Sequence, residues 1–174
     1  MIELSVVRDL VTIFGVIAGF SYYVLTVRNA NKARQQTISR ELVKELSSVE
    51  NQRIFMELLL MDWIDFDDSL KKYDSTVNID NYSKRASIWA SYNSMGYELY
   101  KGNIDIETIY HLTGYQVLWF LWNKFKPIIL GYRKRYGNPD HMKWLEYLVD
   151  ELAKERMRQR LPADIIDSDG YITN

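Results

Sequence analysis

The chain begins with a long run of apolar positions that changes abruptly into cations and amides. No charged residue occurs from Leu10 to Val27. At about 1.5 Å per residue, this run would form about 27 Å of helix, close to the ~30 Å hydrocarbon core of a bilayer. The pattern therefore predicts a transmembrane helix over residues 10–27, after a short extracytoplasmic N-terminus of residues 1–9.

The charges on either side of this segment predict its orientation. Arg8 is the one cation before it, whereas five cations follow within twenty residues. Cytoplasmic flanks of membrane helices carry an excess of Lys and Arg. We therefore expect a single-pass protein of the plasma membrane, with the N-terminus outside and the C-terminal domain in the cytoplasm. The predicted membrane-interface residues are Tyr22, Tyr23, Arg28, Lys32 and Arg34.

Two other interpretations of the apolar segment stay open. A cleaved signal peptide would start with basic residues and have a shorter apolar run, whereas Glu3, Arg8 and Asp9 give this start mixed charge. The segment would otherwise be a buried core helix, which an uncharged run of this length at the N-terminus disfavours. The sequence favours a spanning helix over both.

Small and hydroxylated residues lie on one face of the predicted spanning helix. Gly15 and Gly19 form a G-x-x-x-G pattern, which lets two membrane helices approach closely. Glycine is also common in membrane helices for other reasons, so a chance pattern is the alternative. The pattern is compatible with a homodimer, whose helix–helix contact would be at Thr12, Gly15, Gly19, Tyr22 and Thr26.

Beyond the apolar segment, the pattern predicts an all-α protein. The predicted transmembrane helix continues into a cytosolic helical bundle, residues 28–160, and residues 161–174 are expected to be a mobile acidic tail. No Gly or Pro lies between Ala30 and Leu60, so we expect the first helix to continue without a break. Residues 54–66 are apolar on most sides, which predicts the central helix of the core.

Turn and capping residues divide the rest of the chain into further helices. Asp65 and its acidic neighbours are expected to start a short helix that ends near Lys72. Later helices are predicted to run to Tyr100 after a cap at Asn81 or Ser83, from Asp105 to Leu112, over 115–137 with a kink at Pro127, and from Asn138-Pro139 to about Arg160.

Composition and charge exclude several classes of function. The chain has 22 Lys and Arg against 23 Asp and Glu, so it has no overall preference for polyanions. It has no cysteine, which excludes disulfides, thiolate catalysis and iron–sulfur clusters. Five cations and no acid lie between Lys124 and Tyr136. They suit a helix C-terminus first and contact with a membrane second, and a nucleic-acid partner is disfavoured.

No motif for catalysis or cofactor binding is present. The two histidines, His111 and His141, are far apart in sequence, and neither a P-loop, a G-x-G-x-x-G nor a G-x-S-x-G motif occurs. The acidic residues 62–68 do not fit an EF-hand, because Leu70 stands where its glycine should be. We therefore expect no enzyme activity, no catalytic residue, no cofactor and no metal site.

Two stretches of the sequence resemble a known protein family. They are GFSYYVLTVRNANKARQ at residues 19–35 and MDWIDFDDSLKKYD at residues 61–74. The sequence is similar to an uncharacterised family of small archaeal and bacterial membrane proteins, with one N-terminal span and a cytosolic helical domain. Trp63, Asp65, Phe66, Asp67 and Asp68 fit its W-x-D-[YF]-[DE]-[DE]-F-like motif, whereas Ser69 replaces an aromatic residue. The resemblance implies this architecture and no activity.

The leading hypothesis is a membrane-anchored cytosolic helical module for interaction or scaffolding. Its expected partners are the lipid bilayer, a second copy of the chain and another protein. The alternative is a membrane-tethered enzyme or ligand-responsive effector with a site between helices. A pocket that unites Asp or Glu, His and Arg would favour the effector, whereas a flat surface with an apolar patch would favour the interaction module.

Overall fold

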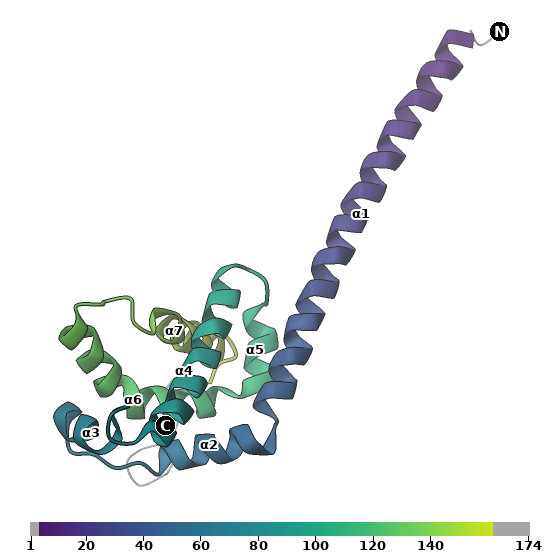
Figure 1. The fold of residues 1–174 in the computed structure, drawn as a ribbon. Coiled ribbons are helices and arrows are strands. Elements are labelled where there is room, and N and C mark those ends of the chain that lie inside the picture. The colour runs from purple at the N-terminus through teal and green to yellow at the C-terminus, as the bar shows by residue number, and fades with distance from the viewer. Residues whose placement is uncertain (1–3, 162–174) are drawn as a thin grey trace. The chain divides into compact units, whose positions relative to one another are not determined.

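A computed structural model describes residues 4–161 of the chain (Figure 1). Within these residues the protein contains seven α-helices and no strand, which confirms the predicted all-α class. The predicted mobile tail lies, apart from Leu161, outside the described residues, as do residues 1–3. The helices are α1 (Leu4–Leu46), α2 (Val49–Leu59), α3 (Phe66–Tyr73), α4 (Ile79–Tyr100), α5 (Ile106–Thr113), α6 (Tyr115–Tyr136) and α7 (Lys143–Arg158).

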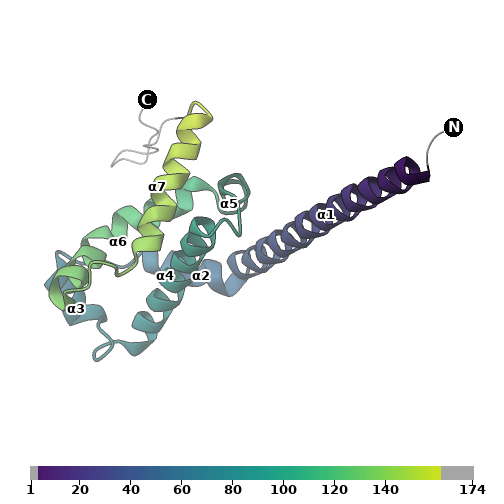
Figure 2. The same ribbon diagram turned by 90° about the horizontal axis from the view of Figure 1, so that it is seen from above.

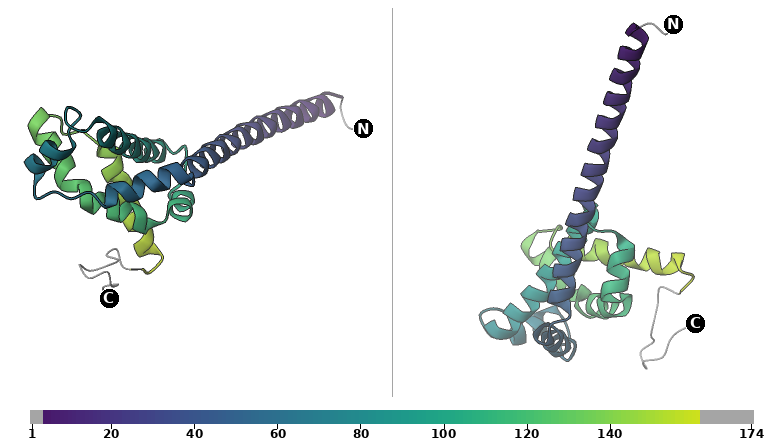
Figure 3. Two further views of the ribbon diagram at one scale, coloured as in Figure 1. Left: turned by 60° about the horizontal axis from the view of Figure 1, so that its bottom comes forward. Right: turned by 90° about the vertical axis from the view of Figure 1, so that its right-hand side faces the viewer.

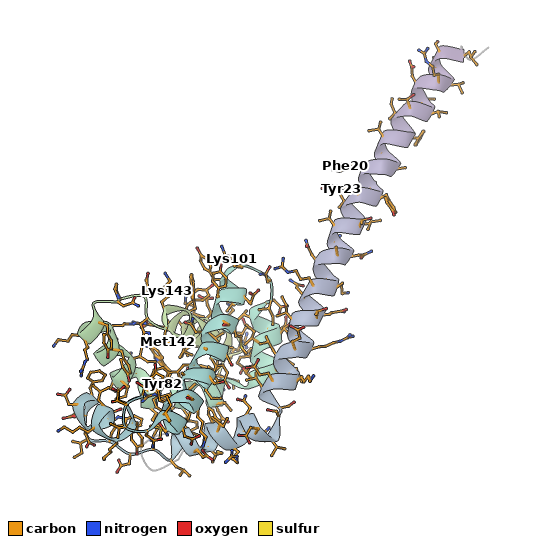
Figure 4. All side chains as sticks on the ribbon, in the orientation of Figure 1. Phe20, Tyr23, Tyr82, Lys101, Met142 and Lys143 are labelled. Carbon is orange, nitrogen blue, oxygen red and sulfur yellow. The ribbon has the colours of Figure 1, made fainter. Side chains whose placement is uncertain are left out.

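The chain divides into two compact units, Met1–Ile38 and Ser39–Asn174. The first unit is the N-terminal part of α1, a helix of 43 residues without a buried residue. This helix is long and apolar enough to cross a membrane, and the residues of its most apolar stretch are exposed. The side chains of Phe20 and Tyr23 stand out from its surface (Figure 4). The predicted long apolar helix is therefore confirmed.

The predicted continuation of the first helix through residue 60 is wrong, because the helix is interrupted at Ser47 and Ser48. α1 ends at Leu46, and α2 begins after Ser48. Ser48 has an extended backbone, and its Oγ accepts a hydrogen bond from the N–H of Asn51 at 3.1 Å. A serine that bonds to the backbone in this way starts a new helix without help from Gly or Pro.

The core of the second unit lies where α4, α6 and α7 pack together (Figure 2). Gly96 of α4 lies against the backbone of α7, and a Cβ at this position would collide with the carbonyl group of Trp144. The two helices therefore approach so closely that only glycine fits. The fully buried apolar side chains of this core include Ile88, Met95, Leu118, Phe125, Ile129, Leu145 and Leu148.

The prediction of a central core helix over residues 54–66 is wrong. α2 ends at Leu59, and residues 60–65 connect it to α3 without helical structure. Leu58 and Met61 are buried, but Leu60 is 79% exposed and Ile64 is 90% exposed. Because α2 ends at Leu59, the apolar residues of this stretch are not all buried along one helix.

Several predicted helix ends are confirmed. Asp65 caps α3, since its carboxylate accepts a hydrogen bond from the N–H of Asp68 at 2.8 Å. Asp105 caps α5 in the same way, and Gly114 separates α5 from α6 with a φ of 68°.

The predicted cap of α4 is wrong, because Asn78 caps this helix rather than Asn81 or Ser83. α6 continues as one helix through Pro127.

The last helix starts later than the predicted Asn138-Pro139 cap. Asn138 instead accepts a hydrogen bond from the N–H of Asp140 in a turn, and α7 begins at Lys143. The start of α7 is capped from another helix: Oδ1 of Asn93 in α4 accepts from the N–H groups of Trp144 and Leu145 at 3.1 and 3.2 Å. The connection between α6 and α7 can be followed from green to yellow in Figure 3.

Candidate functional site

A cavity of about 370 Å³ lies in the second unit, between α4, the C-terminal part of α6 and the connections that follow α3 and α6. This volume falls in the ~300–1,000 Å³ range of small-molecule sites. Tyr82 and Met142, labelled in Figure 4, come to it from α4 and from the α6–α7 connection. Its lining residues are Asp74, Ser75, Tyr82, Arg85, Ala86, Trp89, Tyr132, Tyr136, Asn138, His141 and Met142.

Arg85 is the most unusual residue of this pocket, because it is a charged side chain with only 2% of its surface exposed. Its Nη2 donates hydrogen bonds to the carbonyl oxygen of Tyr73 at 3.3 Å and to the hydroxyl of Tyr132 at 3.2 Å. Within residues 4–161, its Nε and Nη1 donate to no other residue, and no carboxylate forms an ion pair with it. A buried arginine is normally paired with an anionic group.

Aromatic rings surround the guanidinium group of Arg85. Its Cζ lies 5.2 Å from the ring centroid of Trp89, 5.6 Å from that of Tyr82 and 5.9 Å from that of Tyr132. Cation–π contacts at these distances stabilise the positive charge by about 0.5–2 kcal/mol each. They do not supply hydrogen-bond acceptors, so the Nε and Nη1 groups keep their capacity to donate.

Packing behind the pocket wall holds Tyr132 in place. Its ring stacks on that of Tyr136, with centroids 5.9 Å apart and an angle of 13° between the planes. The ring of Phe66 meets it edge-on from α3 at 5.3 Å. Phe66 reaches this position because Gly131 of α6 has no Cβ, which would collide with the phenyl ring. The wall of the pocket is therefore built from α3 and α6 together.

The pocket has one buried cation and one acidic residue among its titratable lining groups. Burial raises the pKa of the Tyr132 hydroxyl, although Arg85 acts in the opposite direction, so this hydroxyl stays protonated at neutral pH. Burial lowers the pKa of His141, and the nearby charge of Arg133 lowers it further. His141 is therefore mainly neutral at pH 7, and Arg85 and Asp74 carry the charges.

Two further polar groups of the pocket residues are buried without a partner in the described part of the chain. They are the indole Nε1 of Trp89 and the Nε2 of His141. Most buried polar atoms in folded proteins have at least one partner. Together with the unused donors of Arg85, they make this the place in the second unit where polar groups most clearly lack partners.

The predicted site residues lie elsewhere, on α1. Tyr22, Tyr23, Arg28, Lys32 and Arg34 are all exposed on the first unit. On the predicted contact face, the hydroxyls of Thr12 and Thr26 donate to backbone carbonyls of their own helix, at 2.9 and 2.8 Å. A Cβ added at Gly15 or Gly19 would meet nothing within 4 Å. None of these residues lines the pocket at Arg85.

The sequence contains one pattern that indicates this pocket, although the predicted site residues do not include it. Tyr82, Arg85, Trp89 and Tyr92 are spaced by three, four and three residues, so they share one face of α4. An arginine within such an aromatic face must be buried with it. The remaining lining residues come from distant parts of the chain, and only the fold brings them to Arg85.

The described residues contain no group of three His, Asp or Glu side chains placed to hold a metal ion. What the arrangement can do chemically is accept an anion at Arg85 beside aromatic rings. A guanidinium group with unused N–H donors can bind carboxylates and phosphates.

Comparison with known proteins identifies a family for the chain. The model of the family described as "Domain of unknown function (DUF4760)" matches residues 10–152. The matched range starts at the first residue of the uncharged segment and includes Asp74, Arg85, Tyr132 and His141. No curated protein and no solved structure matches the chain. The chain therefore belongs to the DUF4760 family.

Proposed function

We propose that this protein is a membrane-anchored, ligand-responsive helical module that binds a small anion in the pocket at Arg85. The observation that carries the proposal is the burial of Arg85 without a carboxylate partner in residues 4–161. An isolated charge in a protein interior costs several kcal/mol unless an opposite charge and hydrogen bonds offset it. A bound anion would supply both.

The site is proposed to bind its ligand without chemically changing it. An acid–base catalyst needs a partner that orients it or shifts its pKa toward its task. His141 and Asp74 both line the pocket, but the pKa of His141 responds to burial and to Arg133, not to Asp74. No hydrogen bond joins the two side chains among the described contacts. Binding therefore fits this arrangement better than catalysis.

The first unit is proposed to anchor the module in the plasma membrane, with residues 10–27 in the bilayer. Its exposed apolar side chains support this proposal, because a lipid environment removes them from water. The cations after Val27 support an outside N-terminus and a cytoplasmic second unit. A reporter fused after Asn174 tests the orientation: it should be active as a cytoplasmic reporter, and activity as a periplasmic reporter would refute this orientation.

Self-association through the face that contains Gly15 and Gly19 is part of the same proposal. The open space beside both glycines leaves room for a second helix. Because Thr12 and Thr26 already bond to their own backbone, close packing rather than new hydrogen bonds would hold the pair. Gly15→Leu with Gly19→Leu should abolish the signal of a membrane two-hybrid assay, and an unchanged signal would exclude this contact.

A docking module for another protein is the second candidate function. Four exposed apolar residues on and after α2 favour it, namely Val49, Met56, Leu60 and Ile64. Such residues are more often covered than left in water when they lie together. Met56→Lys with Leu60→Lys should then remove cross-links to a partner in native membranes. Unchanged cross-links would exclude this surface.

The anion-binding proposal is tested with the full-length protein in detergent. Thermal unfolding is measured with acetate, benzoate, inorganic phosphate and adenosine monophosphate, each at the same ionic strength. A ligand at 100 times its Kd stabilises the folded state by about 2.7 kcal/mol. We expect at least one anion to raise the Tm of the wild type and of Arg53→Met, an exposed control, but not that of Arg85→Met. Equal shifts in all three proteins would reject the proposal.

A further inference from the structure

We propose that the ligand of the Arg85 pocket is an aromatic carboxylate, a planar monoanion attached to a ring. This inference rests on the proposed anion-binding function and specifies the chemical class of the ligand. It follows from three properties of the pocket: the unused donors of the guanidinium group, the acidic residue beside it, and the aromatic rings at its rim.

Arg85 keeps unused donors on both sides of its guanidinium group. Nη2 is occupied by the carbonyl of Tyr73 and the hydroxyl of Tyr132. Nε–H and the hydrogens of Nη1 remain, and they lie on different edges of the planar group because Nη2 stands between them. Each of them can donate one charge-assisted hydrogen bond to a carboxylate oxygen. The guanidinium group thus offers a ligand its positive charge and single hydrogen bonds, and the ligand class is further defined by the charge and the rings of the pocket.

Asp74 makes a second negative charge on the ligand unfavourable. It lines the same cavity, and its charge contributes to the raised pKa of Tyr132, whose hydroxyl accepts a hydrogen bond from Arg85. The field of this carboxylate therefore reaches the place where the anion would bind. Arg85 is the one cation among the lining residues, and His141 is mainly neutral. Since Arg85 and Asp74 have opposite charges, a bound monoanion leaves one net negative charge in the pocket, whereas a dianion would leave two.

The rim of the pocket offers aromatic surface that the protein does not cover. Tyr82 is 36% exposed and Tyr136 is 64% exposed, and both line the cavity. The rings of Trp89 and Tyr132 deeper in the pocket are held by contacts with Arg85 and with each other. A ligand ring that extends outward from the carboxylate would meet Tyr82 or Tyr136. Aromatic pairs of this kind are favourable beyond the area that they bury.

Three probe anions separate these properties in isothermal titration of the full-length protein in detergent at pH 7.5. Benzoate is a planar aromatic monoanion, cyclohexanecarboxylate has the same charge without aromaticity, and phenyl phosphate is an aromatic dianion. We expect benzoate to bind about two- to tenfold more tightly than cyclohexanecarboxylate, which is the range of an aromatic pair. We expect it also to bind more tightly than phenyl phosphate, because Asp74 opposes the second charge.

Two variants assign the effects to residues. Tyr82→Leu with Tyr136→Leu should reduce the preference for benzoate over cyclohexanecarboxylate to about onefold and leave cyclohexanecarboxylate binding intact. Arg85→Met should weaken both carboxylates by about tenfold or more, as expected for lost hydrogen bonds to a charged group. Arg85→Lys keeps the charge but lacks the forked donors, so it should also lose affinity, and it replaces Arg85→Met if that variant does not fold.

The outcomes separate the ligand class from the proposed function. If phenyl phosphate or cyclohexanecarboxylate binds as tightly as benzoate in an Arg85-dependent way, the aromatic carboxylate is wrong and anion binding stands. If the three probes bind equally to wild type and Arg85→Met, or if none binds, the aromatic carboxylate is excluded. The proposed function then falls only if phosphate, acetate and adenosine monophosphate also fail to distinguish wild type from Arg85→Met.

Discussion

The two units of the chain depart from ordinary packing in opposite ways. The first unit exposes apolar side chains from Leu4 to Val27, and none of its described residues is buried. The second unit buries its apolar side chains, as a folded domain should, but it also buries the charge of Arg85. One unit places apolar groups where water would be, and the other places a cation where water is excluded.

This comparison supports the proposal that each unit binds a partner of matching chemistry. Exposed apolar helix surface is stabilised by acyl chains, since a helix satisfies its own backbone hydrogen bonds in lipid. A buried guanidinium group is stabilised by an anion that accepts its free hydrogen bonds. The lipid and the anion are therefore proposed on the same physical basis. In each unit, a chemical group lies in an environment that does not stabilise it.

The largest expected effect concerns the first unit. Val16→Arg with Phe20→Arg places two charges in the proposed membrane segment, which disfavours insertion by about 5–7 kcal/mol in total. The double variant should be released from membranes by carbonate extraction. Leu60→Arg with Ile64→Arg is the control, because these apolar residues are at least as exposed but lie in the second unit. Retention of the first variant in the membrane pellet would contradict the proposed anchor.

A smaller effect is expected from Gly96→Ala in the second unit. The added Cβ would collide with the backbone carbonyl of Trp144, which cannot rotate away as a side chain can. We expect the free energy of unfolding to fall by about 2–3 kcal/mol. Urea unfolding followed by tryptophan fluorescence measures this unit alone, because all five tryptophans lie beyond residue 60. Gly19→Ala, where space is open, should leave the unfolding curve unchanged.

Arg85→Met tests the comparison of the two units by removing the buried charge from the second unit. Without ligand, Arg85→Met should raise the free energy of unfolding by about 1 kcal/mol, because an apolar side chain of similar length suits the aromatic surroundings better than an unpaired cation. The same urea experiment measures it. Arg53→Met, at an exposed ion pair, should change stability by less than about 0.5 kcal/mol. Strong destabilisation by Arg85→Met would mean that Arg85 serves the fold.

The smallest effect concerns pH. The pKa of His141 is lowered by burial and by Arg133, so it lies below the unfolded value. Between these two values the unfolded state binds more protons, and stability therefore falls as the pH is lowered through about 6.5 toward the folded pKa. His141→Gln should flatten the dependence of stability on pH between 7 and 5.5. An identical slope in wild type and variant would show that His141 does not titrate as the structure implies.

The sequence predicts the local features of this fold well. The uncharged run from Leu10 predicts the long first helix, and Asp65, Asp105 and Gly114 mark helix ends correctly, because each acts through neighbouring residues. The cap of α7 could not be predicted, since it is supplied by Asn93, some fifty residues earlier. The start of α2 at Ser48 is a cap that serine favours, but no Gly or Pro marks the end of the helix before it.

The candidate site could be predicted only in part. The spacing of Tyr82, Arg85 and Trp89 already places an arginine on an aromatic helix face. Whether that arginine finds a carboxylate depends on the residues that other helices bring to it. Tyr132 reaches it from α6, and Phe66 of α3 packs behind Tyr132 where Gly131 has no Cβ; both are tertiary features.

The most direct test of the account is to observe the unused Nε–H group of Arg85 itself. In the full-length protein in detergent, NMR resolves the Nε–H signals of arginines, and Arg85→Met identifies the signal of Arg85 by its loss. On titration with benzoate, this signal should shift saturably, while the signal of the exposed Arg53 stays in place. An Arg85 signal that does not move while other signals of the protein show saturable binding would contradict the account.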